Sequence, residues 1–420
     1  MPEQPSIPRN TRVAIVHDWL VTPGGAELVL HELVALFPKA DLFALVDHFS
    51  DADRVALGIP RATTSFLQHI PGGARHYRSF LPLFPAAVRS LDVSGYDLVI
   101  SNSHAAAKGI RTHDRQLHLC YCLSPMRYAW DLRDQYLREA GLERGVKGML
   151  ARALLERMRQ WDLANTSGVD AFATLSNYIA ERIERAYGRI ATVIYPPVDT
   201  EYFDAVSETP NRRGETRGET RGETRGETRG ETRGETRVET RGEKGGGVYV
   251  TASRFVPYKR VDLIARAFTR LLPDRQLVIA GDGPDEAKVR AAAEANVLLA
   301  GRLPRESLRE LLRRARAFVF AAEEDFGIAP VEAMACGTPV IAYAKGGVTE
   351  SVTWGPGGTG VVFEEQSEAA IADAVRRFEA LAEPIPAERC RERALLFSAE
   401  RFRREFGEWV GREWEGFAGR

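Results

Sequence analysis

The stretch that most constrains the fold of this chain lies between residues 317 and 350. A short apolar run, AFVFAA at 317–322, is followed by an acidic turn, a helical pattern and a second apolar run at 340–342. Short apolar runs bounded by turn residues are typical of strands that are buried on both faces in a parallel sheet. Pro330 suits the first turn of the helix between them, where a missing N–H costs nothing. The order strand, turn, helix, strand therefore predicts an α/β unit.

Two carboxylates mark the turn and the helix of this unit. Glu324 lies in the predicted loop, and Glu332 follows after seven intervening residues, about one turn inside the helix. The free backbone N–H groups near Gly327 and Ile328, at the helix start, attract a phosphate. Carboxylates accept hydrogen bonds from sugar and ribose hydroxyls. The pattern therefore predicts a site for a nucleoside diphosphate with a sugar attached.

A pair of cations earlier in the same half supports this interpretation. An apolar run at 248–252 is followed by Arg254 and Lys259, which are five residues apart and lead into a helical pattern. Two cations together with backbone amides can neutralise a departing diphosphate. The alternative is an ordinary pair of surface charges at a helix start.

The segments at 254–259 and 323–342 resemble the donor site of the retaining glycosyltransferases of family 4. The similarity rests on the two glutamates at the family spacing, on the Phe-Gly between them and on the sequence EAMACGTPVIA. The resemblance implies a GT-B fold, with two Rossmann-like domains and an active site in the cleft between them. It also implies that Glu324 contacts the donor sugar, that Glu332 contacts the ribose, and that Arg254 and Lys259 hold the pyrophosphate.

The resemblance carries implications for the chemistry as well. In this family, retention is described as attack by the acceptor on the same face of the sugar from which the leaving group departs. The leaving phosphate accepts the proton of the acceptor hydroxyl. We therefore expect no metal, no cofactor and no enzymic nucleophile. Two carboxylates alone would also fit a glycosidase, but the cationic pair argues against that class.

A glycine pair in the amino-terminal half predicts a second contact with the donor. Residues 12–17 form an apolar run, and a turn then leads to Gly24 and Gly25 before a helical pattern at 26–37. Such a turn allows a phosphate or a sugar to approach backbone amides. In the resembled family this loop closes over the donor phosphates or helps to hold the acceptor. A dehydrogenase is disfavoured because no G-x-G-x-x-G follows a predicted strand.

Two histidines are candidates for a catalytic role on the acceptor side. His104 follows the predicted strand at 96–101, and the carboxyl ends of parallel strands are where open α/β sheets bind ligands. Many relatives have a histidine after the next strand, where this chain has Leu123 and Ser124. We therefore expect His104 to act in catalysis, with His17 as the other candidate and a structural role open for both.

The acceptor is expected to contact the segment that follows that strand, namely Arg127, Tyr128 and Trp130. Two further segments leave peripheral contact with the inner membrane open. The segment at 69–91 combines basic and aromatic residues, and the helical stretch at 146–163 carries arginines among leucines and methionines. For the first segment, an ordinary loop and short helix packed on the sheet is an equal alternative, whereas for the second a solvated face on an amphipathic helix is favoured.

The predicted domain organisation is interrupted by a repeat. Residues 213–236 repeat Arg-Gly-Glu-Thr six times. The repeat has almost no apolar residues, so it cannot bury enough surface to offset the entropy lost on ordering. Each arginine in it is balanced by a glutamate, which disfavours RNA binding. We expect an acceptor-side domain at 1–200, a linker at 201–247, a donor-binding domain at 248–396 and a closing helix at 397–420 that crosses back to the first domain.

Composition excludes several other classes. The chain has 420 residues and a net charge of −1, which gives no global signal for nucleic-acid binding. Four cysteines without a His/Cys cluster indicate free thiols and no metal site, although Cys120 and Cys122 share one face of a strand. The opening residues MPEQPSIPRN have no apolar core and no run of 18 apolar residues follows, so we expect neither a signal peptide nor a membrane span. We expect a cytoplasmic protein.

The sequence thus predicts a metal-independent hexosyltransferase. The expected donor is GDP-mannose and the expected acceptor is a lipid-linked saccharide or polysaccharide precursor, both by resemblance to bacterial mannosyltransferases. One alternative is another GT-B enzyme, such as an epimerase or a phosphorylase, although no motif for a lysine-held pyridoxal phosphate is present. The other is a protein that binds nucleotide sugars without turnover.

Overall fold

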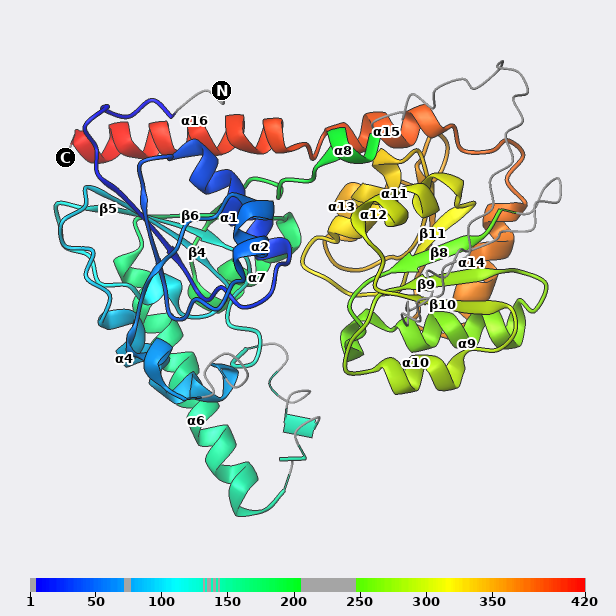
Figure 1. The fold of residues 1–420 in the computed structure, drawn as a ribbon, viewed down its shortest axis with the longest axis horizontal. Helices are drawn as coiled ribbons and strands as arrows, with labels where there is room; N and C mark the ends of the chain where they lie inside the picture. The colour runs from blue at the N-terminus through cyan, green and yellow to red at the C-terminus, as the bar shows by residue number, and fades with distance from the viewer. Residues whose placement is uncertain are drawn as a thin grey trace, which may run out of the picture.

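A computed structural model describes residues 5–71, 77–130, 133, 137–138, 141–142, 144–204 and 247–419. The predicted linker repeat lies outside the described residues. Two parallel sheets, each with helices packed around it, form the two halves of the molecule (Figure 1). This is the α/β architecture that the sequence predicted.

The first sheet has seven parallel strands in the order β3-β2-β1-β4-β5-β6-β7. Every residue of β1, β4 and β5 is buried, as expected for central strands with both faces covered. The strands are β1 (Val13–His17), β2 (Asp41–Ala44), β3 (Thr63–Thr64), β4 (Leu98–Ser103), β5 (Leu117–Cys122), β6 (Ala171–Thr174) and β7 (Ala191–Val193). The α-helices of this half are α1 (Gly25–Leu36), α2 (Asp51–Leu57), α4 (Phe84–Arg89), α6 (Gly145–Ala164) and α7 (Asn177–Tyr187).

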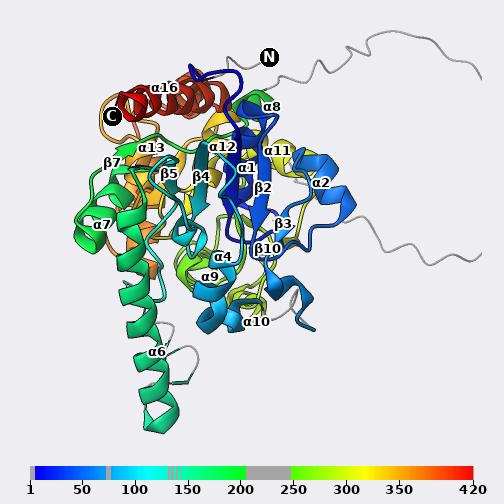
Figure 2. The same ribbon diagram turned by 90° about the vertical axis from the view of Figure 1, so that its left-hand side faces the viewer.

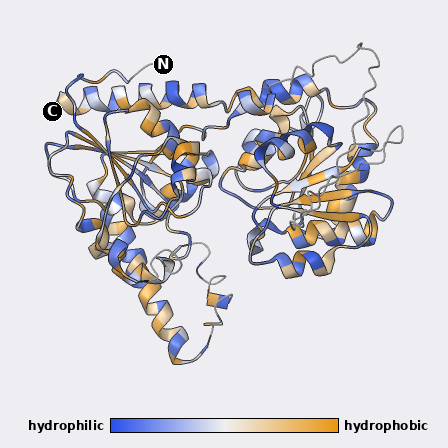
Figure 3. Ribbon diagram, in the orientation of Figure 1, coloured by the Kyte–Doolittle hydropathy of each residue, from blue (hydrophilic) through white to orange (hydrophobic). Residues whose placement is uncertain are grey.

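The second sheet has six parallel strands in the order β10-β9-β8-β11-β12-β13. Its strands are among the most apolar elements of the molecule (Figure 3). They are β8 (Tyr249–Ala252), β9 (Leu277–Ala280), β10 (Val297–Gly301), β11 (Ala317–Phe320), β12 (Val340–Tyr343) and β13 (Gly360–Phe363). Its helices are α9 (Val261–Leu271), α10 (Glu286–Ala292), α11 (Arg305–Arg314), α12 (Ile328–Ala335), α13 (Val348–Ser351) and α14 (Glu368–Glu379).

The chain ends with two helices, α15 (Ala387–Leu395) beside the second sheet and α16 (Ala399–Ala418) along the first (Figures 1 and 2). Phe402 and Phe406 of α16 pack edge-on against Tyr121 of β5, with ring centroids 5.7 and 6.0 Å away. Arg403 forms an ion pair of 2.7 Å with Glu32 of α1. The last helix therefore covers the first domain although it follows the second in sequence.

The repeat is inserted within the second domain rather than between the domains. The short helix α8 (Thr200–Asp204), which precedes the repeat, already packs on α12 and α15. Phe203 of α8 is buried, and its carbonyl accepts a hydrogen bond from the Cys336 thiol after α12. The linker predicted to begin at residue 201 thus begins later, because Phe203 needs the apolar surface of the second domain.

Both ends of this insertion lie beside the carboxyl end of α11. The carbonyl of Asp204 accepts a hydrogen bond from Arg313 at 3.3 Å, and a Cβ on Gly247 would lie 3.1 Å from Cβ of Arg316.

We expect that replacing residues 206–245 with about ten Gly and Ser residues, which can span roughly 30 Å, preserves the fold. Because each halving of a loop removes about 0.6 kcal/mol of closure entropy, the free energy of unfolding should rise by about 1 kcal/mol. Urea unfolding of the two proteins measures this difference, and a loss of more than about 2 kcal/mol would show that the insertion supports the domain.

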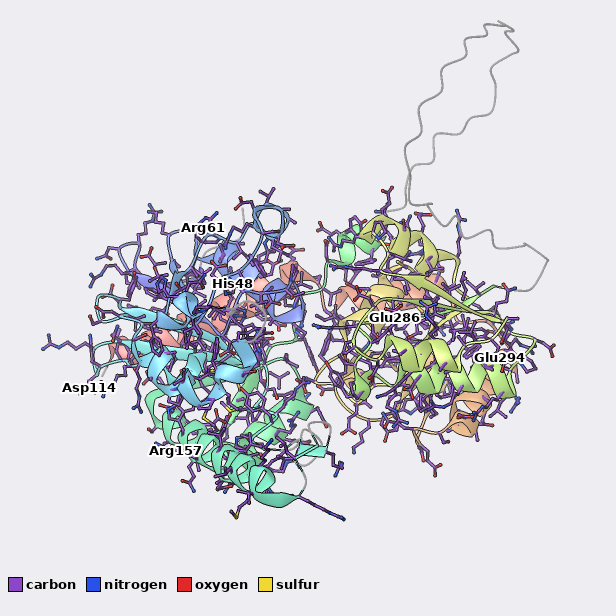
Figure 4. All side chains as sticks on the ribbon, turned by 60° about the horizontal axis from the view of Figure 1, so that its bottom comes forward. His48, Arg61, Asp114, Arg157, Glu286 and Glu294 are labelled. Atoms are coloured by element: carbon purple, nitrogen blue, oxygen red, sulfur yellow. The ribbon has the colours of Figure 1, made fainter. Side chains whose placement is uncertain are left out.

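Helix α6 extends away from the first sheet (Figure 2). It buries Leu155 and Met158, whereas Arg157 is exposed on its outer surface (Figure 4). The segment that follows residue 76 forms a 3-10 helix (Tyr77–Leu83) and α4, which buries Phe84 against the first sheet. Within the described part of the chain, no helix is long and apolar enough to cross a membrane.

Candidate active site

Several of the predicted site residues lie where the chain leaves the strands at the switch points of the two sheets. In the first sheet the chain order reverses between β1 and β4, and in the second between β8 and β11. Loops at the carboxyl ends of strands that flank such a point are where open α/β sheets bind ligands. The loops after β1 and β4 carry Gly24, Gly25 and His104, and those after β8 and β11 carry Arg254, Lys259 and Glu324.

The two sets of loops meet directly. A Cβ on Gly25, the first residue of α1, would lie 3.0 Å from Cδ1 of Ile328, the first residue of α12. Gly24 precedes α1 with extended backbone, and a Cβ there would lie 3.2 Å from the Glu27 carboxylate. The glycine pair of the first domain therefore faces the helix start of the second. The sequence predicted both as donor contacts, and the fold brings Gly25 and Ile328 together.

The backbone of Glu324 is held in place by Gly346 and Gly347, a contact that spacing along the sequence does not predict. It pairs with Gly346 as an isolated β-bridge, and its carbonyl accepts the N–H of Gly347 at 2.8 Å. Gly346 has a φ of 89°, and a Cβ there would lie 2.5 Å from the Glu324 carbonyl oxygen. Only glycine fits this approach, so the glycine pair after β12 fixes the backbone of Glu324.

Lys259 lies on the same side as the Glu324 carboxylate and forms an ion pair with it. The lysine side chain is 18% exposed and the glutamate side chain 12% exposed. Burial lowers the pKa of Lys259 to about 7, and the nearby guanidinium of Arg127 acts in the same direction while Asp325 opposes it. A diphosphate next to this amine would favour its protonated form.

Arg254 follows β8 in a turn whose backbone packs closely against two glycines that follow β9. A Cβ on Gly281 would lie 1.8 Å from the carbonyl oxygen of Ser253, and one on Gly283 would lie 2.5 Å from that of Phe255. Arg254 itself is exposed. Among the described residues, no acidic side chain forms an ion pair with its guanidinium, which leaves this cation available to an anionic ligand.

The start of α12 has the geometry that the sequence predicted. Gly327 precedes the helix with a φ of 90°, which favours glycine. Glu332 lies about one turn into the helix and is partly buried. Burial raises the pKa of Glu332 to about 7; Asp199 acts in the same direction and Arg305 opposes it. Its carboxylate is therefore close to half ionised near neutral pH, and hydroxyl donors would favour the ionised form.

These two pKa values predict a maximum in the pH dependence of nucleotide-sugar affinity. Below pH 7 the protonated Glu332 accepts hydrogen bonds poorly, and above pH 7 the neutral Lys259 no longer attracts the diphosphate. We expect affinity to fall on both sides of about pH 7, approaching tenfold per pH unit. Calorimetric titrations with a nucleotide sugar from pH 5.5 to 8.5 measure it, since the diphosphate diester does not titrate in this range.

Two variants separate the limbs of this profile. Lys259→Arg keeps its charge at all these pH values and should flatten the alkaline limb, whereas Glu332→Gln should flatten the acid limb. An alkaline limb that persists in Lys259→Arg would show that Lys259 is not the titrating group.

His104 is oriented by a buried carboxylate. Asp18, which follows β1, is fully buried and accepts the backbone N–H groups of residues 104 to 107 at 2.6 to 2.9 Å. Its Oδ2 lies 3.1 Å from Nδ1 of His104, whose ring packs edge-on against Trp19 at 4.5 Å. The His104 side chain is 28% exposed, and burial lowers its pKa although Asp18 opposes this.

His17 has a structural environment instead. It is fully buried, with Nε2 3.4 Å from the Glu27 carboxylate and Nδ1 3.3 Å from the Asn102 amide. Between the two candidate histidines, only His104 retains surface that a substrate could contact.

The three residues predicted for the acceptor point to different partners. Arg127 forms an ion pair with Asp325 of the second domain. The indole N–H of Trp130 donates to Asp162 at 2.9 Å, and Tyr128 packs beside Met126 and Met158. Tyr128 and Trp130 thus pack on the same small apolar cluster, whereas Arg127 pairs with the second domain.

Asp162 belongs to a buried cluster that spacing along the sequence does not reveal. It forms an ion pair of 2.5 Å with Lys108 and accepts a hydrogen bond of 2.6 Å from the Tyr187 hydroxyl. Both members of the ion pair are essentially unexposed. This cluster connects Trp130 to Asp162 of α6 and to Tyr187 of α7, which lie 32 and 57 residues away in sequence. Trp130 therefore has a structural role in the first domain.

The four cysteines are buried and free. Within the described part of the chain, no group of three or more His, Cys, Asp or Glu residues could hold a metal ion.

Residues 233–396 match the family model described as glycosyl transferases group 1. One curated relative is the GDP-mannose-dependent monoacylated alpha-(1-6)-phosphatidylinositol monomannoside mannosyltransferase of Corynebacterium glutamicum, 29% identical over 210 residues, or 47% of this chain and 49% of the relative. The D-inositol 3-phosphate glycosyltransferase of Mycolicibacterium gilvum is 41% identical over 118 residues, or 25% and 26% of the two chains. The chain thus spans about half the length, or less, of these relatives.

Solved structures extend the similarity to the whole fold. Anabaena HepE, in complex with UDP and glucose, aligns with a TM-score of 0.63 at 18% identity and covers 96% of this chain and 99% of that one. Sucrose-phosphate synthase from Thermosynechococcus elongatus also gives 0.63 at 18% identity, over 98% and 100% of the two chains. The chain therefore has the GT-B fold of these solved structures, and its residues 233–396 are similar to the glycosyl transferases group 1.

Proposed function

We propose that this protein transfers a sugar from a nucleoside diphosphate to an acceptor with retention of anomeric configuration. The observation that carries the proposal is the convergence of Lys259 and Glu324 beside the start of α12. Arg254 lies after the neighbouring strand and has no ion-pair partner among the described residues. Cations beside a carboxylate suit a ligand that presents phosphates at one end and hydroxyls at the other.

Each residue has a definite role in this proposal. Arg254 and Lys259 hold the diphosphate, and the backbone N–H groups at Gly327 and Ile328 assist them. Glu324 accepts hydrogen bonds from the sugar, and Glu332 accepts them from the ribose. Gly24 and Gly25 allow the first domain to approach the donor closely, and His104 lies on the acceptor side.

The proposed step needs neither a metal nor an enzymic nucleophile. The bond between the anomeric carbon and the diphosphate oxygen breaks, and the acceptor oxygen bonds to the same carbon from the same face. The proton of the acceptor hydroxyl passes to the departing phosphate oxygen. Arg254 and Lys259 stabilise the charge that develops on the leaving group, which is the largest electrostatic change in the step.

GDP-mannose is the proposed donor, and a lipid-linked saccharide at the inner face of a membrane is the proposed acceptor. The named mannosyltransferase of Corynebacterium glutamicum supports both choices. UDP-glucose is the second candidate donor, because the structure of Anabaena HepE holds UDP and glucose.

The experiment is a transfer assay with labelled GDP-mannose or UDP-glucose and lipid-linked saccharides extracted from bacterial membranes. We expect label in the lipid fraction from one donor, and an anomeric configuration in the product that matches the donor. Isomerised sugar without an acceptor would instead indicate an epimerase. Donor binding without turnover for any acceptor would indicate a non-catalytic binding protein.

A further inference from the structure

Asp325 lies between the sugar-contacting Glu324 and Phe326, yet its carboxylate faces the other domain. Its Oδ1 lies 3.1 Å from Nη1 of Arg182 on α7, and its Oδ2 forms an ion pair with Arg127 after β5. Its carbonyl oxygen accepts a hydrogen bond of 2.6 Å from the hydroxyl of Ser176. The Asp325 side chain is 12% exposed and that of Arg182 is 7% exposed. One residue of the donor loop is thus held from three points of the first domain.

The start of α7 makes further contacts with the second domain. The Glu350 carboxylate accepts the backbone N–H groups of Asn177 at 2.8 Å and Tyr178 at 2.9 Å. The hydroxyl of Tyr178 donates to Glu323 at 2.7 Å. A carboxylate at a helix amino terminus is favourable because it meets the free N–H groups and the positive end of the helix dipole. These contacts join the first turn of α7 to both flanks of Glu324.

Glu324 therefore lies between two anchored neighbours. Glu323 is held by Tyr178, and Asp325 is held by Arg127 and Arg182, while consecutive Cα atoms are fixed at about 3.8 Å. Any shift of Asp325 must move the backbone of Glu324. A misplacement of about 1 Å at a reacting group can cost on the order of a hundredfold in rate.

We propose that Asp325 is a positioning residue: through Arg182 and Arg127 it couples docking of the first domain to the placement of Glu324 against the donor sugar. This role rests on the proposed glycosyl transfer. Arg254, the phosphate-binding cation in the separate turn after β8, forms no ion pair with Asp325 among the described residues, whereas Asp325 favours the protonated form of Lys259. The donor would bind through its diphosphate in either case, but transfer would require that the first domain hold Asp325.

The test is the variant Asp325→Asn, which keeps the size of the side chain and removes its charge. We expect kcat to fall about 10- to 100-fold, whereas donor KM and calorimetric affinity for the free nucleoside diphosphate should change by less than about fivefold, the change that remains coming from the loss of the Asp325 charge near Lys259. Arg182→Ala should lose as much, and Arg182→Lys should recover part of the loss. The double variant Asp325→Asn/Arg182→Ala should be no worse than either single variant, because the two residues act as a pair.

Arg185→Ala is the matched control, since Arg185 lies exposed on the same helix and contacts only the carbonyl of Glu181 within the described residues. An active wild type together with a fully active Asp325→Asn would overturn the positioning role alone. So would equal losses in kcat, nucleotide affinity and thermal stability, which indicate a merely structural role. A wild type that transfers no sugar would overturn the proposed function itself.

Discussion

We expect the Glu324→Gln variant to lose about 10²- to 10³-fold in kcat while its affinity for the free nucleoside diphosphate stays equal to wild type or rises. The amide keeps the shape of the side chain but removes the charge that favours the sugar as positive character develops at the anomeric carbon. Losing one preorganised electrostatic contact in an active site typically costs that much. Affinity for the nucleotide does not fall, because Lys259 loses an internal ion-pair partner and pairs with the diphosphate instead.

Transfer kinetics and calorimetry on the same preparations measure the two quantities. The matched control is Glu364→Gln, at an exposed position just after β13. A Glu324→Gln variant with wild-type kcat would remove Glu324 from the mechanism and would leave the ion pair with Lys259 as its role.

Arg254→Ala is expected to weaken binding of the nucleotide sugar about 10²-fold and to lower kcat/KM about 10³-fold. The guanidinium has no acidic partner among the described residues, so its removal leaves no carboxylate unpaired and the protein should remain folded. Hydrogen bonds to charged groups contribute about 1.5–3 kcal/mol, which corresponds to the expected loss of affinity. The additional loss in kcat/KM reflects charge that develops only as the diphosphate departs.

Arg290→Ala is the control for this variant. Arg290 lies exposed on α10 of the second domain, where it pairs with Glu286. Unchanged thermal stability in both variants would assign the effect to the site. Equal affinities for Arg254→Ala and wild type would show that the diphosphate binds elsewhere.

The sequence predicted those parts of the site that depend on local order. Strand, turn and helix follow one another at 317–335, so the positions of Glu324 and Glu332 relative to α12 could be inferred from spacing alone. The same holds for Arg254 and Lys259 after β8. Local patterns succeed here because parallel strands end at one edge of a sheet, and that edge collects the loops.

The contacts between the domains could not be inferred in this way. Asp325 meets Arg127 and Arg182 across sequence separations of 198 and 143 residues, and nothing local distinguishes these arginines from the many others. Glycines 346 and 347 were visible as a pair, but the approach of Glu324 that requires Gly346 appears only in three dimensions. The place of the repeat was missed for a similar reason, because Phe203 of α8 becomes buried only against α12 and α15.

The proposed mechanism requires that the loops after β8 and β11 bind a nucleotide sugar. The most direct measurement is calorimetric titration of the wild-type protein and of Arg254→Ala with GDP-mannose, with UDP-glucose as the second ligand. We expect saturable binding of one of these donors to the wild type, weakened about 10²-fold by the substitution. Binding that is identical in the two proteins, or no binding of either donor, would contradict it.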